Sequence, residues 1–242
     1  MHFSIEQWRA WAPGLAQEGD WQAWSLQSAP PAASDSLPDV SFLPAMQRRR
    51  LSPLARMAFS VAWPLADAHG APLPLVFTSR HGETPRTFAL LSDVSAGAPL
   101  SPTQFSLSVH NAIIGQWSIM RGDTSEMTAL AGEGDGLEHA VLEAQLLLDE
   151  GAPAVLLVIA EDTPPEAYAP WIDDVPFPYA VALLLKPGEQ WQLNLQASAS
   201  PADTATAEWP HALNLVRALA GGTTTLEHRW RSRLWSWQHN SA

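Results

Sequence analysis

Apolar residues recur at a helical period in two long segments of the chain. One segment follows Ser52-Pro53, and its apolar positions have the spacing of a helix that packs on a sheet: Leu54, Met57, Ala58, Val61 and Leu65. The other ends at Gly151, where a glycine stop is expected, and repeats this spacing: Leu137, Ala140, Val141, Ala144, Leu147 and Leu148. Both segments are predicted to be helices that cover a sheet.

Three segments open with a hydroxyl residue followed by proline, which is typical of a helix start: Ser52-Pro53, Thr84-Pro85 and Ser101-Pro102. The third adds Gln104, which completes a capping-box pattern, and predicts one helix that continues through Phe105, Val109, Ala112 and Ile113. A last helix is expected at about Ala207 to Ala220, before Gly221-Gly222.

Short apolar runs between these helices predict buried strands. Leu75 to Phe77 is one, and Ala154 to Ile159 is almost wholly apolar, which is typical of a strand buried on both faces of a parallel sheet. Two further runs, Tyr179 to Leu185 and Trp191 to Leu195, flank a turn-rich tetrapeptide and predict an antiparallel hairpin. The expected fold is therefore α/β, a mostly parallel sheet covered by helices with an added hairpin.

Composition excludes several classes of function. The 242 residues include 13 Lys and Arg against 25 Asp and Glu, a net charge of −12, which disfavours nucleic acid and anionic membranes as partners. The chain has no cysteine, which excludes disulfides, thiolate metal sites and a cysteine nucleophile. Size and 46% hydrophobic content indicate one domain over residues 1–242.

The first 40 residues are expected to be a Trp-rich lead-in followed by an exposed Pro/Ser/Ala loop from Ser28 to Pro38. The longest apolar run, near Ala152 to Ala160, is far shorter than the ~20 residues that span a bilayer, and the N-terminus lacks a signal-peptide pattern. We therefore expect a cytoplasmic protein with no membrane span.

Common catalytic signatures are missing from the sequence: the phosphate-binding loop with Gly-Lys-Ser/Thr, the Gly-x-Ser-x-Gly elbow and the His-Glu-x-x-His pair. The eight histidines show no metal-ligand spacing, so neither a metal nor a cofactor is expected. The Gly-rich segment 132–136 before a helix has no acidic ribose partner at the right spacing and is interpreted as a tight turn.

Three stretches together resemble β-ketoacyl synthases. They are VFTSRHGE (76–83), SPTQFSLSVHNAIIGQWSI (101–119) and GEGDGLEHAVLEAQLLLDEG (132–151). The resemblance covers roughly Arg48 to Trp171 and is greatest to the short, single-half synthase-like proteins of aryl polyene and other type II polyketide systems, which act like chain-length factors. It implies half of a thiolase-like fold.

The resemblance places Glu133 where an active synthase has its cysteine nucleophile. The two catalytic histidines of active synthases belong to the second half of that fold, and His228 and His239 are poor replacements. The resemblance thus implies a non-catalytic subunit that forms a heterodimer with an active ketosynthase, helps to shape the shared acyl tunnel and meets an acyl carrier protein. An ordinary solvated acid at Glu133 is the simpler interpretation.

Several polar and aromatic residues are candidates for the tunnel or the interface: Ser79, Arg80, His81, Glu83, Phe105, His110 and Asn111. For the cluster that follows the first predicted strand, the alternative is a salt-bridged loop brace, and for His110-Asn111 it is a half-buried pair that holds loops. A basic stretch is the candidate carrier-protein contact: Arg48, Arg49 and Arg50.

Two other functions remain open. One is a hydrolase or acyltransferase that uses Ser79 or Ser108 with His81 or His110 as its base. The other is a pathway scaffold that binds carrier protein and leaves the acyl-chain length unchanged.

Overall fold

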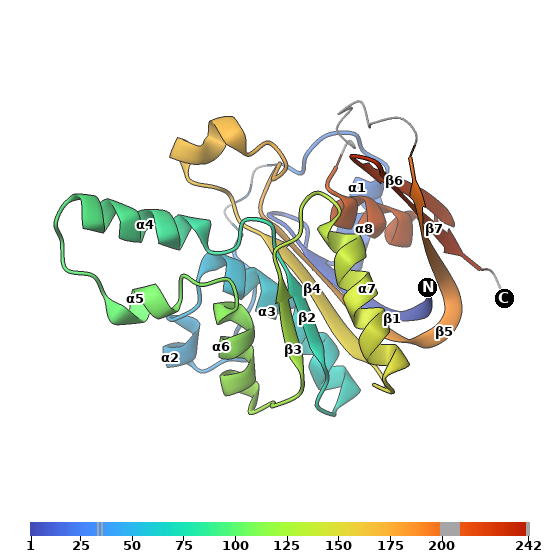
Figure 1. Cartoon of the computed structure of the whole chain (residues 1–242), viewed down its shortest axis with the longest axis horizontal. Coiled ribbons are helices and arrows are strands. Elements are labelled where there is room, and N and C mark those ends of the chain that lie inside the picture. Colours follow the sequence, from blue (N-terminus) through green and yellow to red (C-terminus); the bar gives the residue numbers. More distant parts are fainter. Residues whose placement is uncertain (33, 35, 199–208, 241–242) are drawn as a thin grey trace.

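The computed structural model describes residues 1–32, 34, 36–198 and 209–240. Within these residues one seven-stranded sheet has the order β3-β2-β4-β5-β7-β6, and β1 also pairs with β5 (Figure 1). The strands are β1 (His2–Trp11), β2 (Leu75–Thr78), β3 (Met127–Leu130), β4 (Val155–Glu161), β5 (Tyr179–Ala197), β6 (Thr225–Trp230) and β7 (Arg233–His239).

The helices lie on both faces of this sheet or project beyond its edge. They are α1 (Glu18–Ser25), α2 (Ala45–Arg48), α3 (Pro53–His69), α4 (Thr84–Ser95), α5 (Pro102–Ser106), α6 (Ala112–Arg121), α7 (Gly136–Asp149), the 3-10 helix η1 (Glu166–Trp171) and α8 (His211–Gly221).

Strand β4 separates two hydrophobic cores. Its seven residues are all buried, and alternate side chains point to opposite faces, as the period of a strand requires. Val155, Leu157 and Ile159 join a core with α7 and α8, whereas Leu156 and Val158 join a core with α3 and α6. The prediction of a sheet covered by helices is therefore confirmed.

The sheet is mixed rather than mostly parallel. Only the pairs of β2 with β3 and β4 are parallel, while β5 pairs antiparallel with β1, β4 and β7, and β6 pairs antiparallel with β7. An apolar run indicates burial on both faces but not strand direction. The fully buried β4 itself has a parallel neighbour on one side and an antiparallel neighbour on the other.

The prediction of a hairpin around residues 186–189 is wrong. The two apolar runs belong to one continuous 19-residue strand, β5, and the tetrapeptide between them bulges out against β1. Pairing passes from Ser4↔Lys186 directly to Phe3↔Trp191. A Cβ on Gly188 would lie 2.1 Å from Ser4 Oγ, so this glycine permits close strand approach. The actual hairpin is β6–β7, with Arg231 at φ 54°.

The helix predicted from Ser101 starts correctly but does not continue. The Ser101 hydroxyl accepts the Gln104 backbone N–H at 3.3 Å, as expected for a cap. The chain then leaves the helical path between α5 and α6, where the hydroxyl of Ser108 donates to the Phe105 carbonyl at 2.8 Å. Such local bonds compete with helix hydrogen bonds. The last helix, α8, begins at His211, and the predicted start at Ala207 lies outside the described residues.

The first 40 residues are integrated into the fold. Residues 2–11 form β1, and the indoles of Trp21 and Trp24 on α1 are each 1% exposed in the core beside α8. The described part of the stretch from Ser28 to Pro38 contains neither helix nor strand, as predicted. Among the described residues, no helix combines the length and apolar character required to cross a membrane.

Candidate functional site

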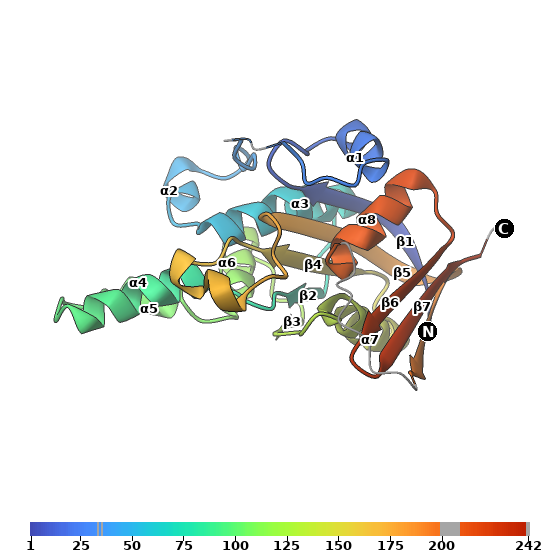
Figure 2. The ribbon, with the colours of Figure 1, turned by 90° about the horizontal axis from the view of Figure 1, so that it is seen from above.

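The turn at residues 132–136 lies where the parallel strands of the sheet end. It connects β3 to α7, while the ends of β2 and β4 lead to Ser79 and to Glu161. Because the carboxyl ends of parallel strands meet at one edge, these segments converge there. The C-terminal hairpin β6–β7 forms one edge of the same sheet, and Figure 2 shows it beside α7. The turn, the two strand ends and the hairpin together form the candidate site.

Asp135 anchors the turn. Its side chain is completely buried and accepts two bonds from the Arg233 guanidinium, Nε to Oδ2 at 2.5 Å and Nη2 to Oδ1 at 3.0 Å. The indole N–H of Trp235 donates to Oδ2 at 3.0 Å. Burial of a carboxylate is costly unless it is paired in this way. The hairpin therefore supplies the charge that allows Asp135 to be buried.

Glu133, at the position implied for the nucleophile, is half exposed and also bound by the hairpin. Its carboxylate accepts Nε1–H of Trp230 at 3.0 Å and pairs with Arg231 at 2.8 Å. The Trp230 hydrogen bond, with further help from the neighbouring arginines, lowers the pKa of Glu133. The carboxylate is thus ionised at neutral pH and directed toward the hairpin.

Gly134 is the point of closest approach between turn and hairpin. A Cβ at this position would lie 2.3 Å from the ring of Trp230, so the indole packs directly on the glycine backbone. The guanidinium carbon of Arg80 lies 5.7 Å from the centroid of the same ring, within reach of a cation-π contact. This packing connects the turn to the segment that follows β2.

The segment after β2 wraps around two carboxylates. Glu161 accepts the Ser79 hydroxyl at 3.1 Å and the backbone N–H of His81 at 3.2 Å. Asp174 pairs with Arg80 at 2.8 Å and with Nε2 of His81 at 2.8 Å.

The pKa values of these two carboxyls move in opposite directions. Burial raises the pKa of Glu161 despite its hydrogen bonds. Burial would also raise the pKa of Asp174, but the hydrogen bond from His81 and the charges of His81 and Arg80 lower it. The segment has the contacts of a loop brace and leaves Ser79 buried, at 1% exposure.

Glu83 does not join this network. It is buried, accepts the Ser52 hydroxyl at 2.5 Å and pairs with Arg86 at 3.3 Å. Ser52 is also the cap of α3 and accepts the Ala55 N–H at 3.0 Å. Glu83 therefore connects the starts of α3 and α4.

The candidates on the segment from Ser101 separate in space. His110 is partly buried, and its Nε2 lies 2.8 Å from the Leu130 carbonyl oxygen at the end of β3. Phe105 is 62% exposed on α5, and Asn111 is exposed at the start of α6. The structure thus gives His110 the loop-holding contact, while Phe105 remains free to meet a partner.

The basic stretch lies at the end of α2. Arg48 donates to the Ser41 carbonyl at 3.3 Å, and Arg49 and Arg50 are exposed. Two of the three charges are therefore available to an acidic partner.

The serines of the hydrolase hypothesis engage other groups than histidine. The hydroxyl of Ser79 donates to Glu161, and that of Ser108 donates to the Phe105 carbonyl. His81 pairs with Asp174, and His110 meets a backbone carbonyl. These contacts do not assemble a serine nucleophile with its base.

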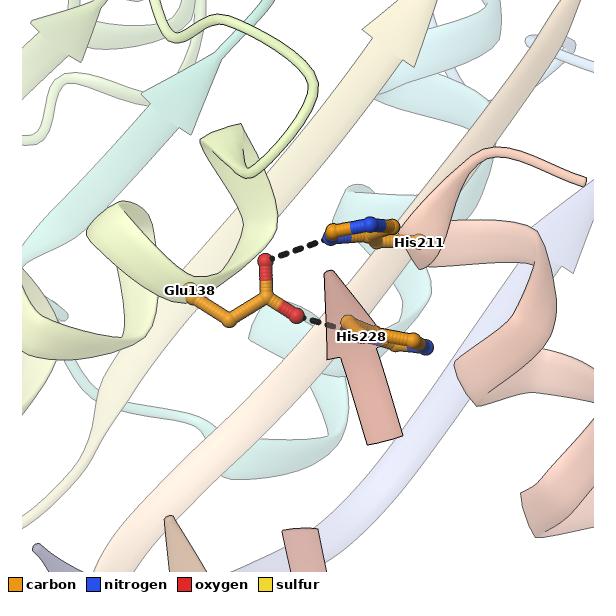
Figure 3. Close-up of side chains that lie close together, drawn as sticks. All are labelled: Glu138, His211 and His228. Carbon is orange, nitrogen blue, oxygen red and sulfur yellow. Dashed lines mark hydrogen bonds and ion pairs between the residues drawn. The ribbon is translucent and has the colours of Figure 1, made fainter. Parts of the chain in front are cut away.

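A buried cluster, absent from our sequence-based candidates, lies one helical turn beyond the site (Figure 3). The Glu138 carboxylate bonds to Nδ1 of His211 at 2.9 Å and Nδ1 of His228 at 2.6 Å, and the two imidazoles stack with centroids 4.1 Å apart. Burial would raise the pKa of Glu138, but hydrogen bonds from both histidines lower it. Burial also lowers the pKa of His228.

The spacing of these residues gave no sign of the cluster, because the three lie 73 and 17 positions apart and only the fold brings them together. One signal was present: Glu138 is a charged residue on the apolar stripe of α7, beside Leu137 and Val141. Such a residue requires buried partners.

The chain is similar to several solved structures. A chain of the ketosynthase ApeO in complex with its chain length factor ApeC, from Xenorhabdus doucetiae, is 31% identical, with 99% of this chain and 100% of that chain covered and a TM-score of 0.86. The ishigamide ketosynthase/chain length factor is 13% identical, covers 100% of both chains and has a TM-score of 0.71.

A third structure, the AntDE:AntF complex of a type II polyketide acyl-carrier protein with its ketosynthase, is 11% identical, with coverage of 98% and 99% and a TM-score of 0.70. A search of the curated proteins finds no match. The family model described as the β-ketoacyl synthase N-terminal domain matches residues 21–238. On that match and the shared thiolase-like architecture, the chain belongs to the β-ketoacyl synthase N-terminal domain family.

Proposed function

We propose that this chain is a non-catalytic, chain-length-factor-type subunit. It pairs with an active ketosynthase in polyene, polyketide or fatty-acid-like biosynthesis in the cytoplasm and shapes the acyl tunnel of the pair. The observation that carries this proposal is the match over the full length of both chains to a member of a ketosynthase and chain length factor complex.

The turn at residues 132–136 supports the non-catalytic role. The position implied for the nucleophile holds Glu133, whose carboxylate is occupied by Trp230 and Arg231. A chain without cysteine cannot form the thioester on which an active synthase depends. In this proposal the hairpin residues stabilise the turn, and the turn carries no nucleophile.

The surface around β3 and α5 supports pairing with another subunit. β3 is an edge strand, bonded only to β2 among the described strands, and an open edge is a template for a partner. Helices α4 and α5 project from the body beyond it (Figure 1). These two helices, the segments on either side of α5 and the neighbouring η1 expose large apolar side chains: Leu91, Val94, Leu100, Phe105, Val109 and Trp171. Apolar side chains gathered in one region are typical of a protein interface.

Co-expression tests the pairing. This chain carries the only tag, the ketosynthase encoded beside its gene is untagged, and light scattering gives the mass of the purified species. We expect a one-to-one complex. Phe105→Asp is expected to abolish it, because a carboxylate would be buried in the contact. Leu26→Asp is the matched control, since Leu26 is 88% exposed at the C-cap of α1, away from this surface.

A monomer with no affinity for the ketosynthase would contradict the proposal. If the complex forms, product length separates a tunnel-shaping subunit from a scaffold. Enlarging or reducing side chains near α5 should change the length of the polyene in mass spectra, whereas unchanged length would favour scaffolding. Replacing Arg49 and Arg50 with Glu should weaken binding of the acyl carrier protein if these exposed charges contact it.

A further inference from the structure

The cluster of Glu138, His211 and His228 brings metal-ligand atoms together in the interior. Glu138 lies in the first turn of α7, His211 is the first residue of α8, and His228 is on β6. Each imidazole directs Nδ1 at a different carboxylate oxygen (Figure 3). The potential ligand atoms all lie within 4.8 Å of one another.

The cluster has no permanent cation. Glu138 is 0% exposed, and within the described chain its carboxylate has one further donor, Nε1–H of Trp237, at 3.2 Å from Oε1. Neither lysine nor arginine forms an ion pair with it among the described residues, in contrast to Asp135, which is paired with Arg233. A buried carboxylate without a lysine or arginine partner favours binding of a cation.

Hydrogen bonding alone also leaves the cluster incomplete. Within the described structure, Nε2 of His228 is a buried atom with no hydrogen-bond partner. Buried polar atoms without partners are uncommon and call for an explanation. This nitrogen points away from Glu138 (Figure 3), so no second hydrogen bond holds the imidazole of His228 against turning toward an ion.

The donor atoms lie close to the geometry of a metal site but need an adjustment to reach it. For a metal ~2.1 Å from each donor, the present oxygen–nitrogen separations correspond to angles of roughly 75–90°, below the tetrahedral angle that zinc prefers. The two imidazole planes are 19° apart, so one ring has to turn before both Nδ1 atoms can face the same ion. Two donors on one such ion cannot lie more than ~4.2 Å apart, so the 4.8 Å limit requires a shift of at most ~0.6 Å. The two carboxylate oxygens and two Nδ1 atoms supply four donor atoms.

We propose that Glu138, His211 and His228 bind one divalent transition-metal ion, with zinc as the preferred ion. Two imidazoles and a carboxylate form a ligand set that zinc uses in proteins. The ion replaces the two imidazole–carboxylate hydrogen bonds and connects α7, α8 and β6. Its role is structural, it does not touch the proposed interface, and it does not depend on the proposed function.

The test is the metal content of the whole chain, purified through a tag without histidine and in the absence of chelator. After incubation with micromolar zinc and desalting, we expect about one zinc per chain by mass spectrometry. Cobalt should give the absorption bands of a nitrogen- and oxygen-ligated ion. His228→Gln and Glu138→Gln are expected to weaken zinc binding by more than ~100-fold. His69→Gln, at the far end of α3, is the matched control and should retain the ion.

Two results would overturn the proposal. One is a folded wild-type chain that retains less than a tenth of an equivalent of zinc. The other is stoichiometric zinc that persists in the folded Glu138 and His228 variants. If either variant fails to fold, the wild type decides, because zinc must then raise its melting temperature and a chelator must reverse the shift.

Discussion

Replacing Arg233 with glutamine should destabilise the turn at residues 132–136 more than any other single loss of charge on the hairpin. Arg233 makes two hydrogen bonds to Asp135, whose side chain is fully buried. Arg233→Gln removes the cation and leaves the Asp135 carboxylate in the interior with the imidazole of His139, 3.5 Å away, as its nearest basic group. The destabilisation therefore comes mostly from the Asp135 carboxylate, which stays buried after its main partner is removed.

The size of the loss follows from the burial of the two partners. Breaking a fully buried pair from one side costs about 3–5 kcal/mol. Arg233 itself is 33% exposed, and Asp135 keeps the N–H of Trp235 as a donor, so water and that bond recover part of the loss. We expect the free energy of unfolding to fall by about 2 kcal/mol.

Urea unfolding of the purified chain, followed by circular dichroism, measures this change. Arg229→Gln is the control, because Arg229 is 53% exposed and lies 3.6 Å from an exposed glutamate, which makes a change below about 0.5 kcal/mol the expectation. Adding Asp135→Asn to Arg233→Gln removes the stranded charge and should restore at least half of the lost stability. A loss in Arg233→Gln no larger than that in the control would refute the reasoning.

Three further predictions follow from the site. Gly134→Ala should lower unfolding free energy by about 1–3 kcal/mol and shift tryptophan fluorescence, because its Cβ would overlap an indole, whereas Gly19→Ala has open space and should be neutral or slightly stabilising. Burial would raise the pKa of Asp174, but its hydrogen bond with His81 lowers it. The wild type should therefore be more stable than Asp174→Asn above about pH 4, and this difference should shrink as the pH falls. Unfolding measured along an acid titration tests this. A fluorophosphonate probe should leave the chain unlabelled, since the hydroxyl of Ser79 is buried against a carboxylate; stoichiometric labelling would revive the hydrolase hypothesis.

The sequence predicts best the elements whose burial is regular. α7 and β4 follow from periodicity, because each presents apolar residues at its own period to a core on one or both faces. The C-terminal hairpin was missed since its tryptophans and arginines alternate between core and turn contacts, and nothing local reveals that Arg233 pairs with Asp135, 98 residues earlier. Long-range pairing of this kind is decided by the fold.

The candidate site shows the same division. Convergence of the SRHGE segment on one edge was predictable, because it directly follows a buried strand. The partners of its side chains could not be predicted. Ser79 bonds to Glu161, His81 to Asp174 and Glu83 to Ser52, and each partner comes from a different part of the chain. Glu133 was correctly placed in a turn, but its binding by Trp230 depends on a hairpin that the periodicity did not reveal.

The pairing of β1 with β5 has a consequence for how the chain folds during synthesis. Phe3 lies opposite Trp191, so β1 leaves the ribosome well before its partner strand, which is made almost 190 residues later. At ~5–20 residues per second that interval is roughly 10–40 s, far longer than hydrophobic collapse requires. During this time apolar positions of β1 such as Phe3 and Ile5, both buried in the folded protein, have no native partner strand. Folding yield should therefore depend on translation speed and chaperones more than the final stability suggests.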